Sequence, residues 1–296
     1  MVLLAIVLLA IWLRGPLLMA AIGLAAGLAA HEFYSMVRRA GYLPWYAAGV
    51  AVALLLALRA YLVGDITSGV ASTQTGVAAE VLALAVVVLM LMLRQGSDWV
   101  RVPAASSTGA GGAPARPGIS LPRSPYLAWA DIGLTLGGAL YTGGLLGYAG
   151  LLAALPGDVS GKGSGTAWML AVLLGTAGCD TGAYFVGSIF GRRKLIPHIS
   201  PGKTWEGLAG GAAGGVIAAL LLSGFLGLSW AQAVVLGLLI CTAAVAGDLC
   251  ESLIKRAVGV KDSGNLIPGH GGILDRVDSI LFVLLTVYWV ARVVQL

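Results

Sequence analysis

Long apolar runs recur along this sequence, and they constrain its fold more than any other feature. Hydrophobic residues make up 58% of the 296 residues, and many runs approach the ~20 residues that a helix needs to cross a bilayer. Such a chain cannot fold in water around a single core. We therefore predict an all-α integral membrane protein, a polytopic bundle of about nine transmembrane helices with the apolar segments 2–13, 17–30, 44–63, 78–94, 126–155, 166–190, 205–228, 230–247 and 279–296.

The chain divides into two predicted regions. Residues 1–155 supply N-terminal transmembrane helices, and they include a Gly-, Ser- and Pro-rich loop at 95–124 whose composition predicts mobility. Residues 156–296 form a C-terminal transmembrane region, which carries the polar stretch described below. The first apolar run has no preceding Lys or Arg, which favours a helical hairpin broken near Gly15 over a cleaved signal peptide.

Glycine spacing predicts close helix packing. The chain has 44 glycines, and small residues four positions apart allow helices to approach one another closely and to pair between subunits. A homodimer is compatible with this pattern. The GxxxG spacings are Gly23/Gly27, Gly143/Gly147, Gly207/Gly211 and Gly210/Gly214.

Basic residues indicate the orientation of the helices. With the N-terminus in the cytoplasm, 14 of the 18 Lys and Arg residues fall on cytoplasmic segments, as the positive-inside rule expects. This orientation places two polar loops, 191–204 and 248–278, together on the cytoplasmic face of a cell (inner) membrane. The same bias explains the net charge of +5, so nucleic acid is not a predicted partner.

The stretch from Asp248 to Asp278 lies between two apolar spans, where ionisable groups are costly and usually functional. It holds nine charged residues in 31 positions, whereas the whole chain is 10% charged. Ser252 and Lys255 follow Asp248 at i+4 and i+7, which places all three on one helical face. Asp275 and Asp278 are spaced i, i+3 at the start of the last helix. Carboxylate oxygens near cationic side chains favour Mg²⁺ over zinc or copper.

Glycines between these acids predict an anion-binding turn. The run from Pro268 to Gly272 contains three glycines whose backbone N–H groups can face a phosphate, and His270 is a further hydrogen-bond donor rather than a metal ligand. The other polar loop contributes Ser200 and Lys203. Asp180 lies inside an apolar span, where an acid needs a specific reason.

Other polar residues have simpler interpretations. The segment from His31 to Tyr34 is interpreted as an aromatic anchor at interface depth, and Asp131 is also expected at the membrane interface. The three cysteines show no paired spacing, so we interpret them as small core residues rather than as a disulfide framework or a zinc site. They are Cys179, Cys241 and Cys250.

These residues resemble the signature of the phosphatidate cytidylyltransferases, also called CDP-diacylglycerol synthases. The family pattern is a Ser, two residues, Lys-Arg, a Lys-Asp pair, Pro-Gly-His-Gly-Gly and Asp-Arg-x-Asp. The segments that begin at Asp180 and Ser200 are also similar to family elements. Gly202 departs from the pattern, because a second lysine is expected there. Across 252–278 the signature appears as Ser252, Lys255-Arg256, Lys261-Asp262, Pro268 to Gly272 and Asp275-Arg276-Val277-Asp278.

The resemblance implies that CMP is transferred from CTP to phosphatidic acid at the cytoplasmic face, giving CDP-diacylglycerol and pyrophosphate. It implies Mg²⁺ held by Asp248 and Asp275, with Asp278 as a further ligand or a supporting acid. A monovalent cation such as K⁺ can share this site, and the family also suggests a homodimer. The implied catalytic residues are Asp248, Lys255, Asp275 and Asp278. The implied substrate-binding residues are Ser200, Lys203, Ser252, Arg256, Lys261, Asp262, His270, Gly271, Gly272 and Arg276.

Two alternatives stay open at the level of the sequence. An ion or lipid transporter could use Asp180, Asp248 and Asp275 as an intramembrane pathway, although the chain shows no internal repeat of the kind that transporters often carry. A cytidylyltransferase that acts on another lipid phosphate, such as an isoprenoid one, would barely change the signature.

Overall fold

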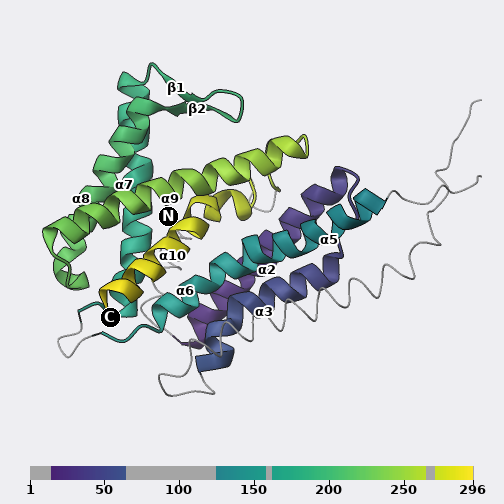
Figure 1. The fold of residues 1–296 in the computed structure, drawn as a ribbon, viewed down its shortest axis with the longest axis horizontal. Helices are drawn as coiled ribbons and strands as arrows, with labels where there is room; N and C mark the ends of the chain where they lie inside the picture. Colours follow the sequence, from purple (N-terminus) through teal and green to yellow (C-terminus); the bar gives the residue numbers. More distant parts are fainter. Residues whose placement is uncertain (1–14, 65–124, 158–161, 265–270, 296) are drawn as a thin grey trace, which may run out of the picture.

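The computed structural model describes residues 15–64, 125–157, 162–264 and 271–295, and its fold is dominated by helices (Figure 1). The predicted segments 2–13 and 78–94 and the predicted loop 95–124 lie outside the described residues. In chain order the elements are α2 (Pro16–Arg39), α3 (Tyr46–Gly64), α5 (Pro125–Ala139), the π-helical turn η1 (Leu140–Gly144), α6 (Leu145–Ala153), α7 (Gly165–Phe190), β1 (Lys194–Ile196), β2 (Ser200–Thr204), α8 (Trp205–Leu226), α9 (Trp230–Ala257) and α10 (Leu274–Val294).

The described helices account for the apolar runs in their part of the sequence. Within these ranges, six helices are long and apolar enough to cross a membrane: α2, the continuous helix from α5 through η1 to α6, α7, α8, α9 and α10. A shorter apolar helix in α3 accounts for the predicted run 44–63. The fold is therefore that of an all-α membrane protein. The count of nine helices and the division at residue 155 stay predictions.

The last two helices extend beyond the predicted apolar runs. α9 continues past the predicted end at 247, and α10 begins before the predicted start at 279. The predicted bounds mark the apolar spans, whereas the helices extend into the polar stretch; the predicted helical face of Asp248, Ser252 and Lys255 and the place of Asp275 at the start of the last helix are confirmed. Lys255 and Arg256 in the last turn of α9 interact favourably with the helix dipole, and Gly259 then turns the chain with a φ of 74°. The polar face that starts at Asp248 is therefore part of a rigid helix.

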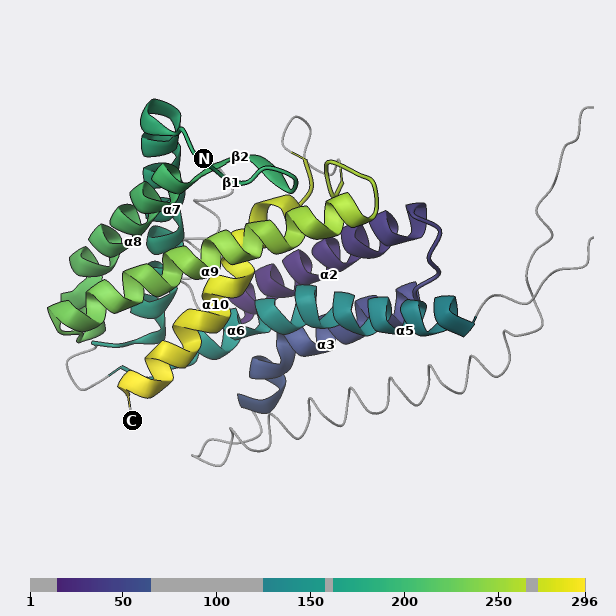
Figure 2. The ribbon, with the colours of Figure 1, turned by 45° about the horizontal axis from the view of Figure 1, so that its top comes forward.

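α10 lies between two groups of helices (Figures 1 and 2). It packs on α9 and α7 on one side and on α6 and α2 on the other. Buried side chains from both groups form one hydrophobic core. Residues on α10 can therefore contact elements from the N-terminal and C-terminal parts of the chain.

Glycines allow α7 and α8 to pack backbone to backbone. A Cβ atom on Gly214 would overlap the carbonyl oxygen of Gly178, and one on Gly210 would overlap that of Gly182. The predicted close approach at the Gly210/Gly214 spacing is thus confirmed.

The loop predicted at 191–204 contains a short β-hairpin, which the sequence pattern did not reveal. Its strands are antiparallel, with Ile196 opposite Ser200. The Thr204 hydroxyl accepts a hydrogen bond of 3.0 Å from the backbone N–H of Gly207 and so caps α8. The Glu206 carboxylate accepts the backbone N–H of Arg192 at 3.1 Å. These contacts fix the hairpin to the start of α8.

Candidate active site

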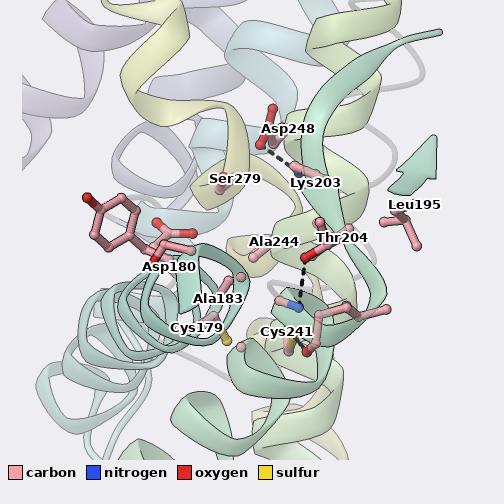
Figure 3. Close-up of a pocket in the computed structure, with 18 residues that line it drawn as sticks. Cys179, Asp180, Ala183, Leu195, Lys203, Thr204, Cys241, Ala244, Asp248 and Ser279 are labelled. Carbon is pink, nitrogen blue, oxygen red and sulfur yellow. Dashed lines mark hydrogen bonds and ion pairs between the residues drawn. The ribbon is translucent and has the colours of Figure 1, made fainter. Parts of the chain in front are cut away.

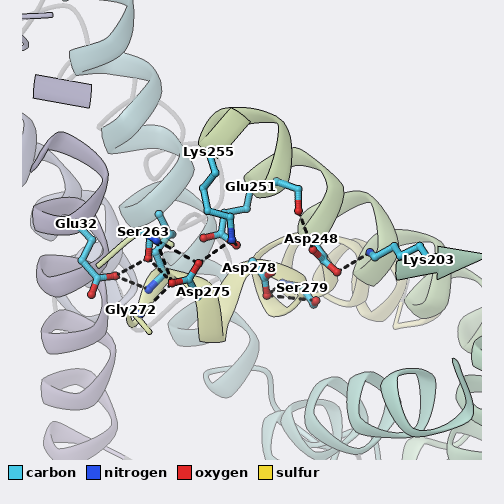
Figure 4. A network of polar contacts seen from close by, with 12 residues as sticks. Glu32, Lys203, Asp248, Glu251, Lys255, Ser263, Gly272, Asp275, Asp278 and Ser279 are labelled. Atoms are coloured by element: carbon cyan, nitrogen blue, oxygen red, sulfur yellow. Dashed lines mark hydrogen bonds and ion pairs between the residues drawn. The ribbon is translucent and has the colours of Figure 1, made fainter. Parts of the chain in front are cut away.

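Lys203 and Asp248 join the two polar loops. Lys203 lies on β2, and its Nζ atom is 2.6 Å from Asp248 Oδ2 on α9 (Figure 4). Their side chains are 22% and 34% exposed, so solvent and ligands can reach the pair. The two loops predicted to share a face therefore touch, while the compartment that they face stays a prediction.

One face of α9 carries polar residues at the predicted spacing. Ser252 Oγ donates a hydrogen bond of 3.3 Å to Asp248 Oδ1. One turn further on, Lys255 Nζ lies 3.2 Å from Glu251 Oε2 and 2.7 Å from Asp275 Oδ1. Lys255 therefore connects α9 to the first turn of α10.

Asp275 is held on several sides by the loop that precedes it. Its Oδ2 atom accepts hydrogen bonds from the backbone N–H of Gly272 at 2.9 Å and from Ser263 Oγ at 2.9 Å. The backbone N–H of Ser263 donates to the same oxygen at 3.1 Å. Gly271 takes a φ of 78°, which favours glycine, and thereby lets the chain turn back onto Asp275. The orientation of Asp275 is thus set before any ligand binds.

Asp278 lies one turn further along α10, close to the backbone of α9. Its Oδ1 atom accepts the backbone N–H of Ser279 at 2.6 Å. A Cβ atom on Gly247 would overlap the backbone carbonyl of Asp278, so the glycine lets the two helices meet closely here. This close approach places Asp278 opposite the helical turn that carries Asp248.

A cavity of about 480 Å³ opens between α7, α8, α9 and the hairpin (Figure 3). Asp180, Lys203, Asp248 and Ser279 contribute polar groups to its lining, and apolar side chains such as Leu208 line other parts. Asp180 therefore shares a cavity with the ion pair of Lys203 and Asp248. This position accounts for an acid within an apolar span.

Several residues of the predicted signature do not line this cavity. Ser200 is half-buried on β2 and does not line the cavity. Gly202 does line it, and a Cβ atom there would meet no other atom within 4 Å, so this position has room for a side chain. His270 lies outside the described residues. The signature residues that are exposed and do not line the cavity are Arg256, Lys261, Asp262 and Arg276.

The network contains more acids than bases. Four carboxylates lie along α9 and α10, and two lysines accompany them. The Glu251 side chain is 0% exposed, and apart from its ion pair with Lys255 neither carboxylate oxygen has a hydrogen-bond partner among the described residues. This set of oxygen donors fits the chemistry of Mg²⁺. Within the described ranges, however, no group of three or more His, Cys, Asp or Glu side chains is arranged to hold a metal ion.

Sequence reasoning missed three of the polar residues in this region. Glu251 and Ser263 lie inside the signature but have no fixed place in its pattern. Glu32 was interpreted with its neighbours as an interface anchor and was assigned no part in the site; Glu32, Phe33 and Tyr34 are all buried within the protein. An acid within an apolar run was the available signal.

Asp131 is also buried within the protein, and its place at the membrane interface stays a prediction. It is 8% exposed, and its Oδ1 atom accepts the backbone N–H of Leu43 at 2.7 Å. It lies on α5, whereas the polar network lies along α9 and α10. We therefore assign Asp131 no part in the site.

Comparison with known protein families identifies the family of this chain. The model of the cytidylyltransferase family matches residues 1–294. The chain belongs to this family.

Several curated relatives match part of this chain. A phosphatidate cytidylyltransferase of Mycobacterium bovis is 42% identical over 120 residues, which cover 40% of this chain and 39% of that protein. One of Pseudomonas aeruginosa is 45% identical over 125 residues, or 38% of this chain and 42% of that protein. The chloroplastic phosphatidate cytidylyltransferase 5 of Arabidopsis thaliana is 48% identical over 134 residues, which cover 43% of this chain and 33% of that protein. The chain thus matches less than half the length of each of these relatives.

Proposed function

We propose that the protein is a phosphatidate cytidylyltransferase, which transfers CMP from CTP to phosphatidic acid and yields CDP-diacylglycerol and pyrophosphate. The observation that carries this proposal is the network of acids and lysines along α9 and α10, beside a cavity in a bundle of helices long enough to span a membrane. Membership of the cytidylyltransferase family supports it, and the relatives named above carry the name of this activity.

The proposed reaction is a displacement at phosphorus. A phosphate oxygen of phosphatidic acid attacks the α-phosphorus of CTP and forms a new P–O bond. The bond between the α-phosphorus and the bridging oxygen breaks, and pyrophosphate leaves with the electron pair. A phosphate monoester is largely dianionic near neutral pH, so the nucleophile needs no general base. The main obstacle is the repulsion between two polyanions.

Lys203 and Lys255 provide positive charge against this repulsion. Lys203 lines the cavity, so its ammonium group can exchange Asp248 for a phosphate oxygen of a bound substrate. Lys255 is 15% exposed and is held between Glu251 and Asp275. A cation in such a fixed, partly buried position stabilises negative charge better than a solvated one. Lys203 therefore binds substrate phosphate, and Lys255 fixes the acidic end of the site.

The acidic residues of the site would hold the cation cofactor. Asp248 and Asp275 are the proposed Mg²⁺ ligands, Asp278 is a further ligand or a supporting acid, and a monovalent ion such as K⁺ can share the site. When bound, Mg²⁺ offsets the charge of the triphosphate. Further contacts with the substrates are proposed for Ser200, Ser252, Arg256, Lys261, Asp262, His270, Gly271, Gly272 and Arg276.

The membrane setting follows from the same proposal. CTP reaches the hairpin and the signature loop from the cytoplasm, and phosphatidic acid enters between helices with its acyl chains in the bilayer of the cell (inner) membrane. Apolar side chains on the outer face of α8, such as Leu221 and Phe225, are 76% and 68% exposed and suit contact with lipid. A homodimer is part of this proposal.

A reconstituted assay tests the activity. The purified full chain in detergent is supplied with phosphatidic acid, CTP and Mg²⁺, and pyrophosphate and CDP-lipid are measured together. We expect equal amounts of both products and complete loss with EDTA. The Asp275→Asn variant should be slower by at least about 10²-fold, because it weakens the proposed cation site. Asp131→Asn is the matched control, a buried acid remote from the site, and should retain activity.

The outcomes separate the competing functions. A wild type that binds CTP but forms no CDP-lipid from phosphatidic acid would exclude this acceptor and favour another lipid phosphate, such as an isoprenoid one. A protein that neither binds CTP nor depends on Asp275 would contradict cytidylyl transfer altogether, and ion or lipid transport would then be measured.

A further inference from the structure

Glu32 contacts the signature region, although it lies far from that region in the sequence. It lies on α2, and its side chain is buried, with 2% of the residue exposed. Its Oε1 atom accepts the backbone N–H of Ile273 at 2.9 Å, and its Oε2 atom accepts that of Leu274 at 2.8 Å. Ser263 Oγ lies 3.2 Å from the same Oε2 atom. A single carboxylate from the first described helix thus meets three donors of the signature region.

These contacts replace a missing helix cap. The first backbone N–H groups of an α-helix have no acceptor within the helix. At the start of α10 the capping position is Ile273, whose side chain provides no hydrogen bond. Glu32 supplies the acceptor from another helix, and its negative charge suits the positive end of the helix dipole. Burying a carboxylate is costly unless it is well hydrogen-bonded, and three donors satisfy that condition here.

Ser263 extends this anchor to Asp275. Its Oγ atom lies 3.2 Å from Glu32 Oε2 and 2.9 Å from Asp275 Oδ2. A hydroxyl has one proton, so it donates to one of the two carboxylates at a time. Asp275 directly follows Leu274, whose N–H is bound to Glu32. Two routes therefore connect Glu32 to Asp275, one through the backbone and one through Ser263.

Glu32 packs tightly against the backbone of Gly264 and Gly272. A Cβ atom on Gly264 would lie 2.8 Å from Glu32 Oε1, and one on Gly272 would overlap Oε2. The backbone at Gly264 and at Gly272 thus packs against the same carboxylate, so a change at Glu32 should affect both positions.

We propose that Glu32 is a positioning residue for the site: it anchors the start of α10 and Ser263, and so holds Asp275 against Lys255 and in the orientation needed for the proposed Mg²⁺ site. This inference rests on the proposed function for its catalytic consequence, but the anchoring itself does not depend on substrate. If Glu32 has this role, helix α2 contributes a residue to a site whose other residues lie after residue 179.

Glu32→Gln in the full chain tests the anchor. Glutamine has a similar size but only one acceptor oxygen, and its NH₂ group faces a donor, so at least one backbone hydrogen bond is lost. Asp131→Asn is the matched control, because Asp131 is also buried and also accepts a backbone N–H. Hydrogen exchange is measured in detergent on peptides that cover Ile273 and Leu274. We expect exchange there to be faster by about tenfold or more in Glu32→Gln, and unchanged in Asp131→Asn.

Kinetics then separate positioning from general stability. In Glu32→Gln we expect kcat to fall by about tenfold or more and the Mg²⁺ concentration for half-maximal rate to rise, with a smaller change in KM for CTP. Glu32→Asp keeps the charge but is one methylene shorter, so it should restore part of the rate. Ser263→Ala removes only the bridge to Asp275 and provides a second test if Glu32→Gln does not fold.

Two results would overturn the inference. One is wild-type exchange and wild-type Mg²⁺ dependence in both Glu32→Gln and Ser263→Ala. The other is an equal loss of rate in Glu32→Gln and Asp131→Asn with no change in Mg²⁺ dependence, which would mean a loss of stability alone. Because hydrogen exchange requires no substrate, a wild type without cytidylyl transfer would refute the proposed function, and the exchange rates would still decide whether Glu32 anchors the loop.

Discussion

Lys203 carries the positive charge that the hairpin brings to the cavity, and its replacement should weaken binding of CTP. We expect Lys203→Gln to lower kcat/KM for CTP by about tenfold or more, since a hydrogen bond to a charged group contributes roughly 1.5–3 kcal/mol. The measurement is the initial rate as a function of CTP concentration. Lys194→Gln is the matched control, because Lys194 lies on the other strand of the same hairpin with an exposed side chain. Equal losses in both variants would indicate a general effect of hairpin charge and contradict a specific role for Lys203.

Local spacing predicted some residues of the site and could not predict others. Asp248, Ser252 and Lys255 share a helical face because positions four and seven apart coincide in any α-helix. Glu32 contacts a backbone N–H 241 residues later in the chain, and no local pattern contains that information. The pairing of Lys203 with Asp248 likewise depends on how α8 and α9 pack, which the order of spans leaves open.

The contact between α7 and α8 depends on glycine, and the addition of one methyl group at Gly214 should disrupt it. A Cβ atom on Gly214 would overlap the backbone of Gly178, so we expect Gly214→Ala to lower the free energy of unfolding by about 1–3 kcal/mol. Thermal unfolding in detergent measures this. Gly224→Ala on the same helix is the control, because its Cβ atom would meet nothing within 4 Å. Alanine favours the helix there by up to about 1 kcal/mol, so the melting temperature should stay constant or rise. Equal melting temperatures for the two variants would contradict close packing at Gly214.

Hydropathy predicted the presence of the described helices better than the residues at which they begin and end. The apolar runs in the described ranges are helices because a bilayer leaves the backbone few other ways to satisfy its hydrogen bonds. Hydropathy alone ends the apolar span before Asp248, and the i+4 and i+7 spacing of Ser252 and Lys255 was needed to predict that the helix continues. The hairpin from Lys194 to Thr204 was missed because its strands are too short for a periodic pattern.

At the scale of the molecule, the polar loops gather at one end of the bundle. The hairpin follows α7, and the signature loop follows α9, and the contact between Lys203 and Asp248 shows that they lie at the same end. Lys162 precedes α7, so a helix of 26 residues separates it from the hairpin. If α7 spans the membrane, Lys162 and Lys194 must face opposite compartments. The proposed function further requires the hairpin end to face the cytoplasm, where CTP is available.

Cysteine labelling tests this arrangement as a whole. We expect Lys194→Cys and Lys261→Cys to react with a membrane-impermeant maleimide in inverted inner-membrane vesicles and not in right-side-out vesicles, and Lys162→Cys to show the reverse. All three lysines are exposed, and the wild type, with Cys179 and Cys241 buried and Cys250 half-buried, gives the background. Labelling of Lys162→Cys and Lys194→Cys from the same side would contradict a membrane-spanning α7. The reverse orientation for all three would leave the helices in place but put the site out of reach of cytoplasmic CTP, so it would contradict the proposed function rather than the fold.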